Sequence, residues 1–94
     1  MKRVLLTSEE LEKSLGGLEP WQLSNKTLER KLTFNSFAEA FAFMTNVALI
    51  AEKMDHHPDW SNSYNKVAIS LTTHSSGGIT QLDIDLAEYI NKLA

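Results

Sequence analysis

The sequence contains no cysteine in its 94 residues. Disulfides and thiolate metal ligands are therefore excluded, nothing points to an oxidising compartment, and we expect stability to come from core packing or self-association. Long apolar runs are also absent. No segment approaches the roughly 20 residues of a membrane span, and Val4-Leu5-Leu6 is shorter than a signal-peptide core of about 7 to 15 residues. We therefore expect a cytoplasmic protein that does not enter a membrane.

Positive charge is scarce and scattered, with 9 Lys and Arg against 12 Asp and Glu and a net charge of −3. A nucleic-acid surface needs clustered positive charge to neutralise phosphates, so we expect no direct binding of nucleic acid. What the sequence does have is a 43% share of hydrophobic residues, enough to supply one core. At this length we expect a single domain spanning residues 1–94.

Capping signals and hydrophobic spacing divide the chain into seven elements. Thr7-x-x-Glu10, Ser36-x-x-Glu39 and Thr80-x-x-Asp83 fit the starts of three helices, and period-two alternation predicts strands between them. The expected elements are a helix at about 8–16, an antiparallel hairpin burying Trp21, Leu23, Leu28, Leu32 and Phe34, a helix from about 36 to 55, strands at 60–65 and 66–73, and a helix after Thr80 burying Leu82, Leu86, Ala87, Ile90 and Leu93. This order, α-β-β-α-β-β-α, predicts an α+β two-layer sandwich in which helices pack on one face of a four-stranded antiparallel sheet.

The long central helix carries an apolar arc that covers about half of its circumference. The arc comprises Phe37, Ala40, Phe41, Phe43, Met44, Val47, Ala48, Ile50 and Ala51. One interpretation is a deeply buried core helix, and the other is that part of the arc packs in a subunit interface. The helical geometry alone leaves both open.

The three histidines occupy two connections between elements. His56 and His57 adjoin Pro58, which ends the long helix, and His74 follows the strongest strand. An unperturbed histidine has a pKa of about 6.5, so it can donate and accept protons near neutrality. Loop residues held by a scaffold of helices and strands often form sites. Three solvated or structural histidines are the equally open alternative.

Two other chemistries compete for these residues. A zinc site is disfavoured because neighbouring residues on a helix project about 100° apart and do not readily share one ion, and we expect no metal. A nucleophilic serine is disfavoured because no Gly-x-Ser-x-Gly motif is present, and Gly77-Gly78 is best interpreted as a turn. The chemistry that remains is proton transfer among imidazoles and carboxylates.

The same residues carry a resemblance to a known family. The block Glu52-Lys53-x-Asp55-His56-His57-Pro58-x-Trp60-x-x-x-Tyr64-x-x-Val67, followed by Thr73-His74 and Gly78-x-Thr80-x-x-Asp83, resembles the signature of the pterin-4a-carbinolamine dehydratases, which are also known as the dimerisation cofactor of a homeodomain transcription factor. The likeness covers nearly the whole chain. It implies a four-stranded antiparallel sheet with helices on one face, and subunits joined as homodimers or homotetramers.

The resemblance implies elimination of water from a 4a-hydroxytetrahydropterin to give a quinonoid dihydropterin, with no cofactor and no metal. It implies that His56 and His74 act as acid and base and that His57 binds and orients the pterin substrate. The substrate-binding set implied is Asp55, His56, His57, Thr72, Thr73, His74 and Ser75, and the supporting residues implied are Glu52, Pro58, Trp60 and Asp83. Thr80 already explains Asp83 as a capping partner, and Trp60 fits a core anchor better than a stacking platform.

A function of a different class stays open beside the enzyme. The broad apolar helix face and the family's double role are also consistent with a non-catalytic interaction module that serves as a dimerisation or assembly cofactor, or as a transcriptional coactivator, for a protein partner. The intact histidine block favours catalysis, because a pure binding module does not need three titratable rings.

Overall fold

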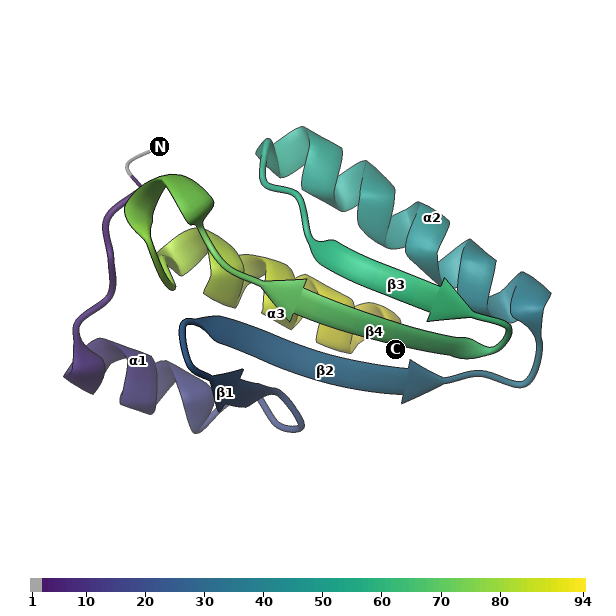
Figure 1. Ribbon diagram of the computed structural model, residues 1–94, viewed down its shortest axis with the longest axis horizontal. Helices are drawn as coiled ribbons and strands as arrows, with labels where there is room; N and C mark the ends of the chain where they lie inside the picture. Colours follow the sequence, from purple (N-terminus) through teal and green to yellow (C-terminus); the bar gives the residue numbers. More distant parts are fainter. Residues whose placement is uncertain (1–2) are drawn as a thin grey trace.

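Four strands form one antiparallel sheet in the computed structural model, which describes residues 3–94 (Figure 1). The elements in chain order are α1 (Ser8–Leu15), β1 (Gln22–Ser24), β2 (Thr27–Thr33), α2 (Phe37–Met54), β3 (Asp59–Ser63), β4 (Lys66–Leu71), the single 3₁₀ turn η1 (His74–Ser76) and α3 (Gln81–Leu93). The strand order is β1-β2-β4-β3. The predicted α+β class and the order α-β-β-α-β-β-α are confirmed; η1 lies where the sequence predicts a strand exit and a loop.

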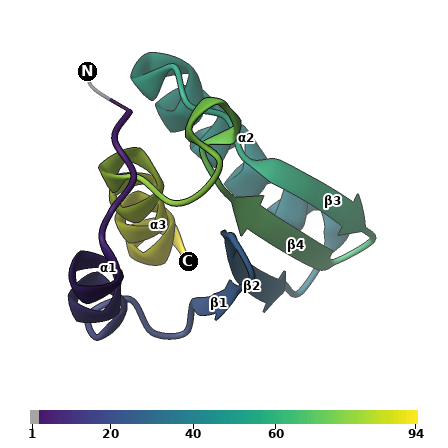
Figure 2. The same ribbon diagram turned by 60° about the vertical axis from the view of Figure 1, so that its left-hand side comes forward.

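The core lies between the sheet and the paired helices α2 and α3, which lie on the same side of the sheet (Figure 2). The strand β4 alternates as the sequence predicts, because Val67, Ile69 and Leu71 are buried while their neighbours are less so. The neighbouring strand β2 presents Leu28 and Leu32 to the same layer. Because β2 and β4 are the two central strands, β4 is hydrogen-bonded to a neighbour on each side close to the connection that follows it.

Several predicted core positions lie elsewhere. Leu23 is 43% exposed, because β1 has only three residues and lies at the sheet edge. Trp21 is buried but precedes β1, and its indole Nε1–H donates to Asn91 Oδ1 at 2.7 Å, so a tertiary hydrogen bond fixes it. Leu93 is 41% exposed at the last residue of α3. The predicted burial is therefore wrong for Leu23 and Leu93, since both lie where the opposing layer ends.

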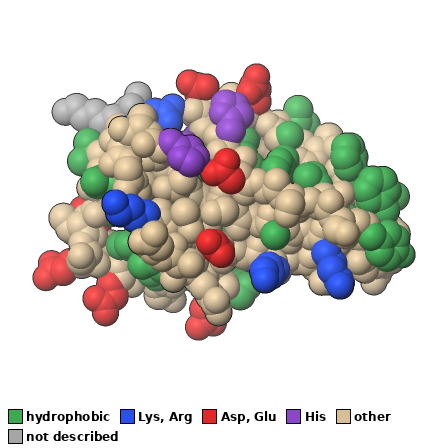
Figure 3. All heavy atoms as spheres, in the orientation of Figure 1, with side chains coloured by type: hydrophobic (Ala, Val, Ile, Leu, Met, Phe, Trp, Pro, Cys, Tyr) green, Lys and Arg blue, Asp and Glu red, His purple; other side chains and the backbone are tan. Residues whose placement is uncertain are grey.

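The apolar arc of α2 is only partly covered. Ala40, Phe43, Val47 and Ala51 are buried against the core. Met44 and Ile50 are partly buried against it, whereas Phe37 is 50% exposed and Phe41 is 55% exposed. Hydrophobic side chains gather at the end of the molecule where α2 begins (Figure 3). The interpretation of a fully buried core helix is therefore wrong for this part of α2.

No helix within residues 3–94 is long and apolar enough to cross a membrane.

Candidate active site

The exits of α2 and β4 meet beside the N-terminal segment and enclose a pocket of about 240 Å³. Its lining residues are Arg3, Asp55, His56, His57, Thr72, Thr73, His74 and Ser75. The structure thus brings together all seven residues that the sequence assigns to substrate binding or catalysis, from two connections that are 15 residues apart along the chain. Histidine side chains are visible close together on this part of the surface (Figure 3).

The way α2 ends directs the two adjacent histidines to different environments. Asp55 takes the left-handed conformation, with φ 52° and ψ 43°, and the His56 N–H donates back to Ala51 O at 3.1 Å. Such a turn satisfies the last helical carbonyls and reverses the chain direction. His56 is consequently only 4% exposed, whereas the side chain of His57 is 58% exposed.

The buried imidazole of His56 is held by a buried carboxylate. Its Nε2 lies 2.6 Å from Asp83 Oδ1, and Asp83 is fully buried in the first turn of α3. The other carboxylate oxygen accepts hydrogen bonds from the Thr73 hydroxyl at 2.8 Å and from the Thr80 N–H at 2.9 Å. Asp83 thus forms the capping box with Thr80 and also binds His56, so both roles considered from the sequence are met by one side chain.

The hydrogen bonds around Asp83 fix where the protons lie. Since Thr73 gives its hydroxyl proton to Asp83, the 2.8 Å contact between the hydroxyls of Thr73 and Thr80 must be donated by Thr80. An ionised carboxylate only accepts, so the His56 Nε2–H is the donor to Asp83. A neutral His56 therefore keeps its lone pair on Nδ1.

The two other histidines are paired with carboxylates at the surface. His57 Nε2 lies 2.8 Å from Glu52 Oε1, and His74 Nε2 lies 2.9 Å from Asp59 Oδ2. The side chains of His74 and Asp59 are 77% and 61% exposed. Surface pairs of this kind contribute little to stability, about 0 to 1 kcal/mol, but they orient a ring.

The other predicted supporting residues lie further away. Pro58 and Trp60 do not line the pocket; Trp60 packs against the hydrophobic core from β3. Sequence reasoning missed two residues, Asp59 and Arg3. Asp59 was part of the conspicuous block around the histidines, but only the antiparallel pairing of β3 with β4 brings it to His74. Arg3 stands within a basic N-terminus, which gives no signal for a pocket residue.

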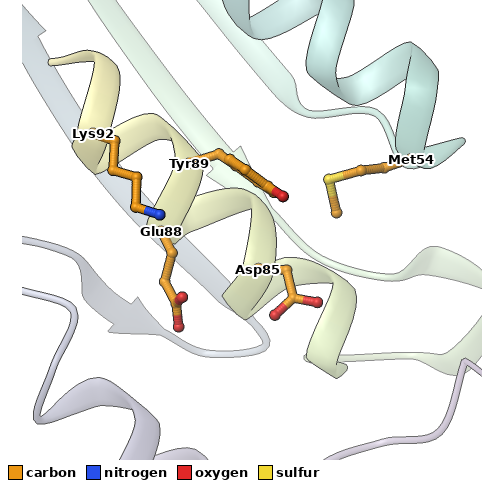
Figure 4. A pocket seen from close by; sticks show the side chains of 5 residues that line it. All are labelled: Met54, Asp85, Glu88, Tyr89 and Lys92. Atoms are coloured by element: carbon orange, nitrogen blue, oxygen red, sulfur yellow. The ribbon is translucent and has the colours of Figure 1, made fainter.

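A second pocket, of about 380 Å³, lies between the end of α2 and the outer face of α3. It is lined by Met54, Asp85, Glu88, Tyr89 and Lys92, and the Tyr89 hydroxyl points toward Met54 (Figure 4). This pocket holds none of the histidines. The candidate site for proton transfer by an imidazole is therefore the smaller, histidine-lined pocket.

The family model and the similar proteins found by comparison all carry the same family description. The chain matches the family described as pterin 4 alpha carbinolamine dehydratase over residues 4–93. A protein of Prochlorococcus marinus (strain NATL2A) that bears the inferred name pterin-4-alpha-carbinolamine dehydratase is 52% identical over 89 residues, which cover 95% of this chain and 94% of that protein. A protein of Chelativorans sp. (strain BNC1) with the same inferred name is 47% identical and covers 100% of this chain and 98% of its own.

Solved structures resemble the fold described above. The crystal structure of a transcriptional coactivator/pterin dehydratase from Brucella melitensis has a TM-score of 0.91 and 44% identity, covering 95% of this chain and 97% of that one. A pterin dehydratase-like protein identified as a RuBisCO assembly factor in the alpha-carboxysome has a TM-score of 0.64 and 24% identity over 79% of this chain and 86% of its own. At that identity, the second likeness concerns the fold alone.

Proposed function

Because this chain belongs to the pterin 4 alpha carbinolamine dehydratase family, we propose that it eliminates water from a 4a-hydroxytetrahydropterin of the 4a-hydroxytetrahydrobiopterin type. The product is the quinonoid dihydropterin, and the step belongs to tetrahydropterin recycling. The observation that carries the proposal is that His56, His57 and His74 line one pocket and each binds a carboxylate through Nε2. Paired imidazoles of this kind suit proton transfer at neutral pH.

The elimination requires two proton transfers. An acid protonates the hydroxyl at C4a while the C4a–O bond breaks and water departs, and a base removes the proton from ring N5, whose electron pair forms the new C4a=N5 bond. We assign acid and base to His56 and His74, and binding and orientation of the pterin to His57. Each correctly placed acid or base contributes about 10² to 10⁴ in rate.

The polar groups around the histidines complete the substrate site. The end of β4 and the turn η1 bring Thr72, Thr73 and Ser75 to the pocket. The backbone groups of Thr72 and Ser75 are assigned to the amide edge of the pterin ring, because those of Thr73 already bind Gly78, Ser76 and Gly77. Asp55 lies at the same wall. Asp83 fixes which nitrogen of His56 faces the substrate, whereas the exposed pair with Glu52 orients the His57 ring only weakly.

A direct assay tests the enzyme. Purified protein is added to freshly generated 4a-hydroxytetrahydropterin, and formation of the quinonoid product is followed by absorbance. We expect a rate well above the uncatalysed one and a loss of about 10² to 10⁴ in kcat for His56→Ala and for His74→Ala. Tyr64→Phe, at the exposed β3–β4 turn, is the control that should keep the full rate. A wild-type rate equal to the uncatalysed rate contradicts the proposed function.

We further propose that the chain forms a homodimer or homotetramer through the exposed apolar strip of α2, which comprises Phe37, Phe41 and Ala48. The rings of Phe37 and Phe41 pack on each other with centroids 5.8 Å apart, so they form a continuous apolar surface. Burial of such surface between copies is favourable at about 25 cal/mol per Å². Phe41→Glu should lower the mass measured by sedimentation equilibrium, and Leu93→Glu should leave it unchanged. A monomeric wild-type protein contradicts the proposal.

The same strip supports a second candidate function, which is binding of a protein partner as an assembly factor or transcriptional coactivator. The relative from Brucella melitensis is described as a transcriptional coactivator as well as a pterin dehydratase. Capture of one defined partner from the native cell, lost in Phe41→Glu and retained in His74→Ala, supports this function. Capture that depends on His74 contradicts it.

A further inference from the structure

Residues 3–6, which we call the N-terminal strap, run past η1 to the start of α1 (Figure 1), and Arg3 from this strap lines the pocket. One backbone and one side-chain hydrogen bond anchor it: Leu6 N–H donates to Ile79 O at 3.0 Å, and the Ser76 hydroxyl donates to Arg3 O. The Leu5 side chain packs tightly over Gly78: a β-carbon added to Gly78 would lie 3.1 Å from the side chain of Leu5. These contacts fix the position of Arg3 relative to η1 and to the start of α3.

The guanidinium of Arg3 reaches from the strap to the exit of α2. Its Nη2 donates to the backbone carbonyl of Asp55 at 2.7 Å and lies 3.7 Å from the Asp55 carboxylate. Its Nη1 lies 3.5 Å from Nδ1 of His56. Asp83 already occupies the other ring nitrogen of His56, so this imidazole is held between an anion on Nε2 and a cation on Nδ1.

We propose that Arg3 is a positioning residue that keeps the Nδ1 of His56 unprotonated, so that His56 presents a proton acceptor to the substrate. This assignment rests on the proposed dehydratase function and separates the two roles within it. A permanent cation facing Nδ1 opposes a second proton on the ring, whereas Asp83 holds the first proton on Nε2. His74 has a carboxylate partner, Asp59, and no cation among residues 3–94 is bound to it, which suits it to carry the proton that is given to the leaving hydroxyl.

The proton balance follows from this geometry. When the substrate binds, the N5–H of the pterin replaces the long Arg3 contact at Nδ1 of His56, Nδ1 takes the N5 proton, and the ring becomes an imidazolium bound to Asp83 with Arg3 nearby. Repulsion from Arg3 then favours release of that proton to solvent, which restores the neutral ring. His74 loses its proton to the departing water and regains one from solvent. No oxidant, reductant or further reactant is needed.

Other charged groups near His56 modify the effect of Arg3 without replacing it. The Asp55 carboxylate partly offsets the guanidinium, but its side chain is 88% exposed and well solvated. Within residues 3–94, the titratable groups that face the His56 ring or share its pocket are Arg3 from the strap, Asp83 from α3, Asp55 and His57 from the connection after α2, and His74 from η1.

The test is nitrogen-15 NMR of protein labelled in its three histidines, each assigned through a single His→Gln variant. At pH 7 the wild-type His56 should carry its proton on Nε2 with a bare Nδ1. In Arg3→Gln the ratio of doubly to singly protonated His56, compared at one pH, should rise by about fivefold, which is the effect of one unit charge about 4 Å away in a solvent-like medium. Arg3→Lys should restore most of the wild-type ratio.

Lys13→Gln on α1 removes the same charge from a position outside the pocket and should leave the ratio unchanged. Amide spectra of every variant verify the fold. An unchanged ratio in Arg3→Gln, or a wild-type His56 protonated on Nδ1 alone, overturns the proposal. Neither result depends on catalysis, so an inactive wild-type protein would refute the dehydratase while leaving the effect of Arg3 on His56 measurable.

The kinetic consequence is a second readout. If Arg3 acts through the protonation of His56, the kcat of Arg3→Gln relative to wild type should be low at pH 6 and approach one as the pH is raised, because His56 loses its extra proton. A deficit in Arg3→Gln that is the same at every pH contradicts this action. Lys13→Gln should follow the wild-type profile.

Discussion

Replacement of Asp83 separates the structural role of this carboxylate from its role at His56. In Asp83→Ala three buried donors lose their acceptor: His56 Nε2–H, the Thr73 hydroxyl and the Thr80 N–H, now bound at 2.6 to 2.9 Å. A buried polar group left without a partner costs about 1 to 3 kcal/mol, and breaking a buried charged pair costs about 3 to 5 kcal/mol in total. We expect a loss of about 3 to 5 kcal/mol, a large part of the 5 to 15 kcal/mol typical of a whole domain.

Asp83→Asn should cost less stability and still abolish most catalysis. An amide has one acceptor oxygen, and the Thr80 N–H cannot change its direction, so the oxygen is expected to stay toward Thr73 and Thr80. The amide NH₂ then faces His56 Nε2, which must accept, and the ring proton moves to Nδ1. We expect a loss of about 1 to 3 kcal/mol in stability, because most hydrogen bonds survive. An inverted tautomer behind a catalytic histidine can cost about 10⁴ in kcat, so a loss of about 10² to 10⁴ is expected.

Urea denaturation, the dehydration assay and histidine nitrogen-15 NMR together measure these effects. Asp85→Asn is the matched control, because Asp85 lies one half-turn further along α3, is partly exposed and binds only Gln81 in the described chain. It should keep the wild-type stability, tautomer and kcat. An Asp83→Asn protein whose His56 proton has moved to Nδ1 but whose kcat equals that of wild type would refute the link between the tautomer and the chemistry.

Two further predictions concern the surface pair and the network beneath α3. Asp59→Asn should leave the melting temperature unchanged, because the pair between Asp59 and His74 is exposed. It should lower kcat by about tenfold or more, because His74 loses its carboxylate partner. A lowered melting temperature with full kcat would contradict the assignment of Asp59 to the chemistry. Asn91→Ala should destabilise the fold by about 1 to 3 kcal/mol in urea denaturation, because Asn91 Oδ1 accepts from Trp21 Nε1 at 2.7 Å and from Arg30 Nη1 at 2.6 Å; unchanged stability would show that water replaces the amide oxygen. Burial already lowers the pKa of Arg30, since desolvation disfavours its charge, so loss of an acceptor there is costly.

The parts of the fold that could be predicted from the sequence are those set by neighbouring residues. Pro58 and the capping pair of Thr80 and Asp83 fix where α2 ends and α3 begins, and the alternation in β4 fixes which of its residues face the core. The burial of Leu23 and Leu93 could not be predicted in this way. Periodicity shows which side of an element is apolar, but not where the opposing layer stops.

The residues of the candidate site could likewise be predicted only where the signal lies in neighbouring residues of the sequence. His56, His57 and His74 were recognisable because they stand at the ends of elements, and the two exits meet because β4 runs alongside the connection that follows α2. The partners Asp59 and Arg3 were not recognisable. Their positions depend on strand register and on the strap, which arise from pairings between segments far apart in the sequence.

The three histidines differ more in how they are held than in what they bind. Asp83 holds His56 with the same carboxylate that caps α3, so the orientation of His56 is as stable as the start of that helix. His57 and His74 depend on exposed pairs, which contribute little energy and let both rings reorient around a ligand. A fixed acceptor beside adjustable rings accommodates an elimination in which the N5 proton and the C4a hydroxyl leave from different positions on the substrate. This difference in environment, rather than the shared imidazole chemistry, is the physical basis for giving His56 and His74 opposite roles.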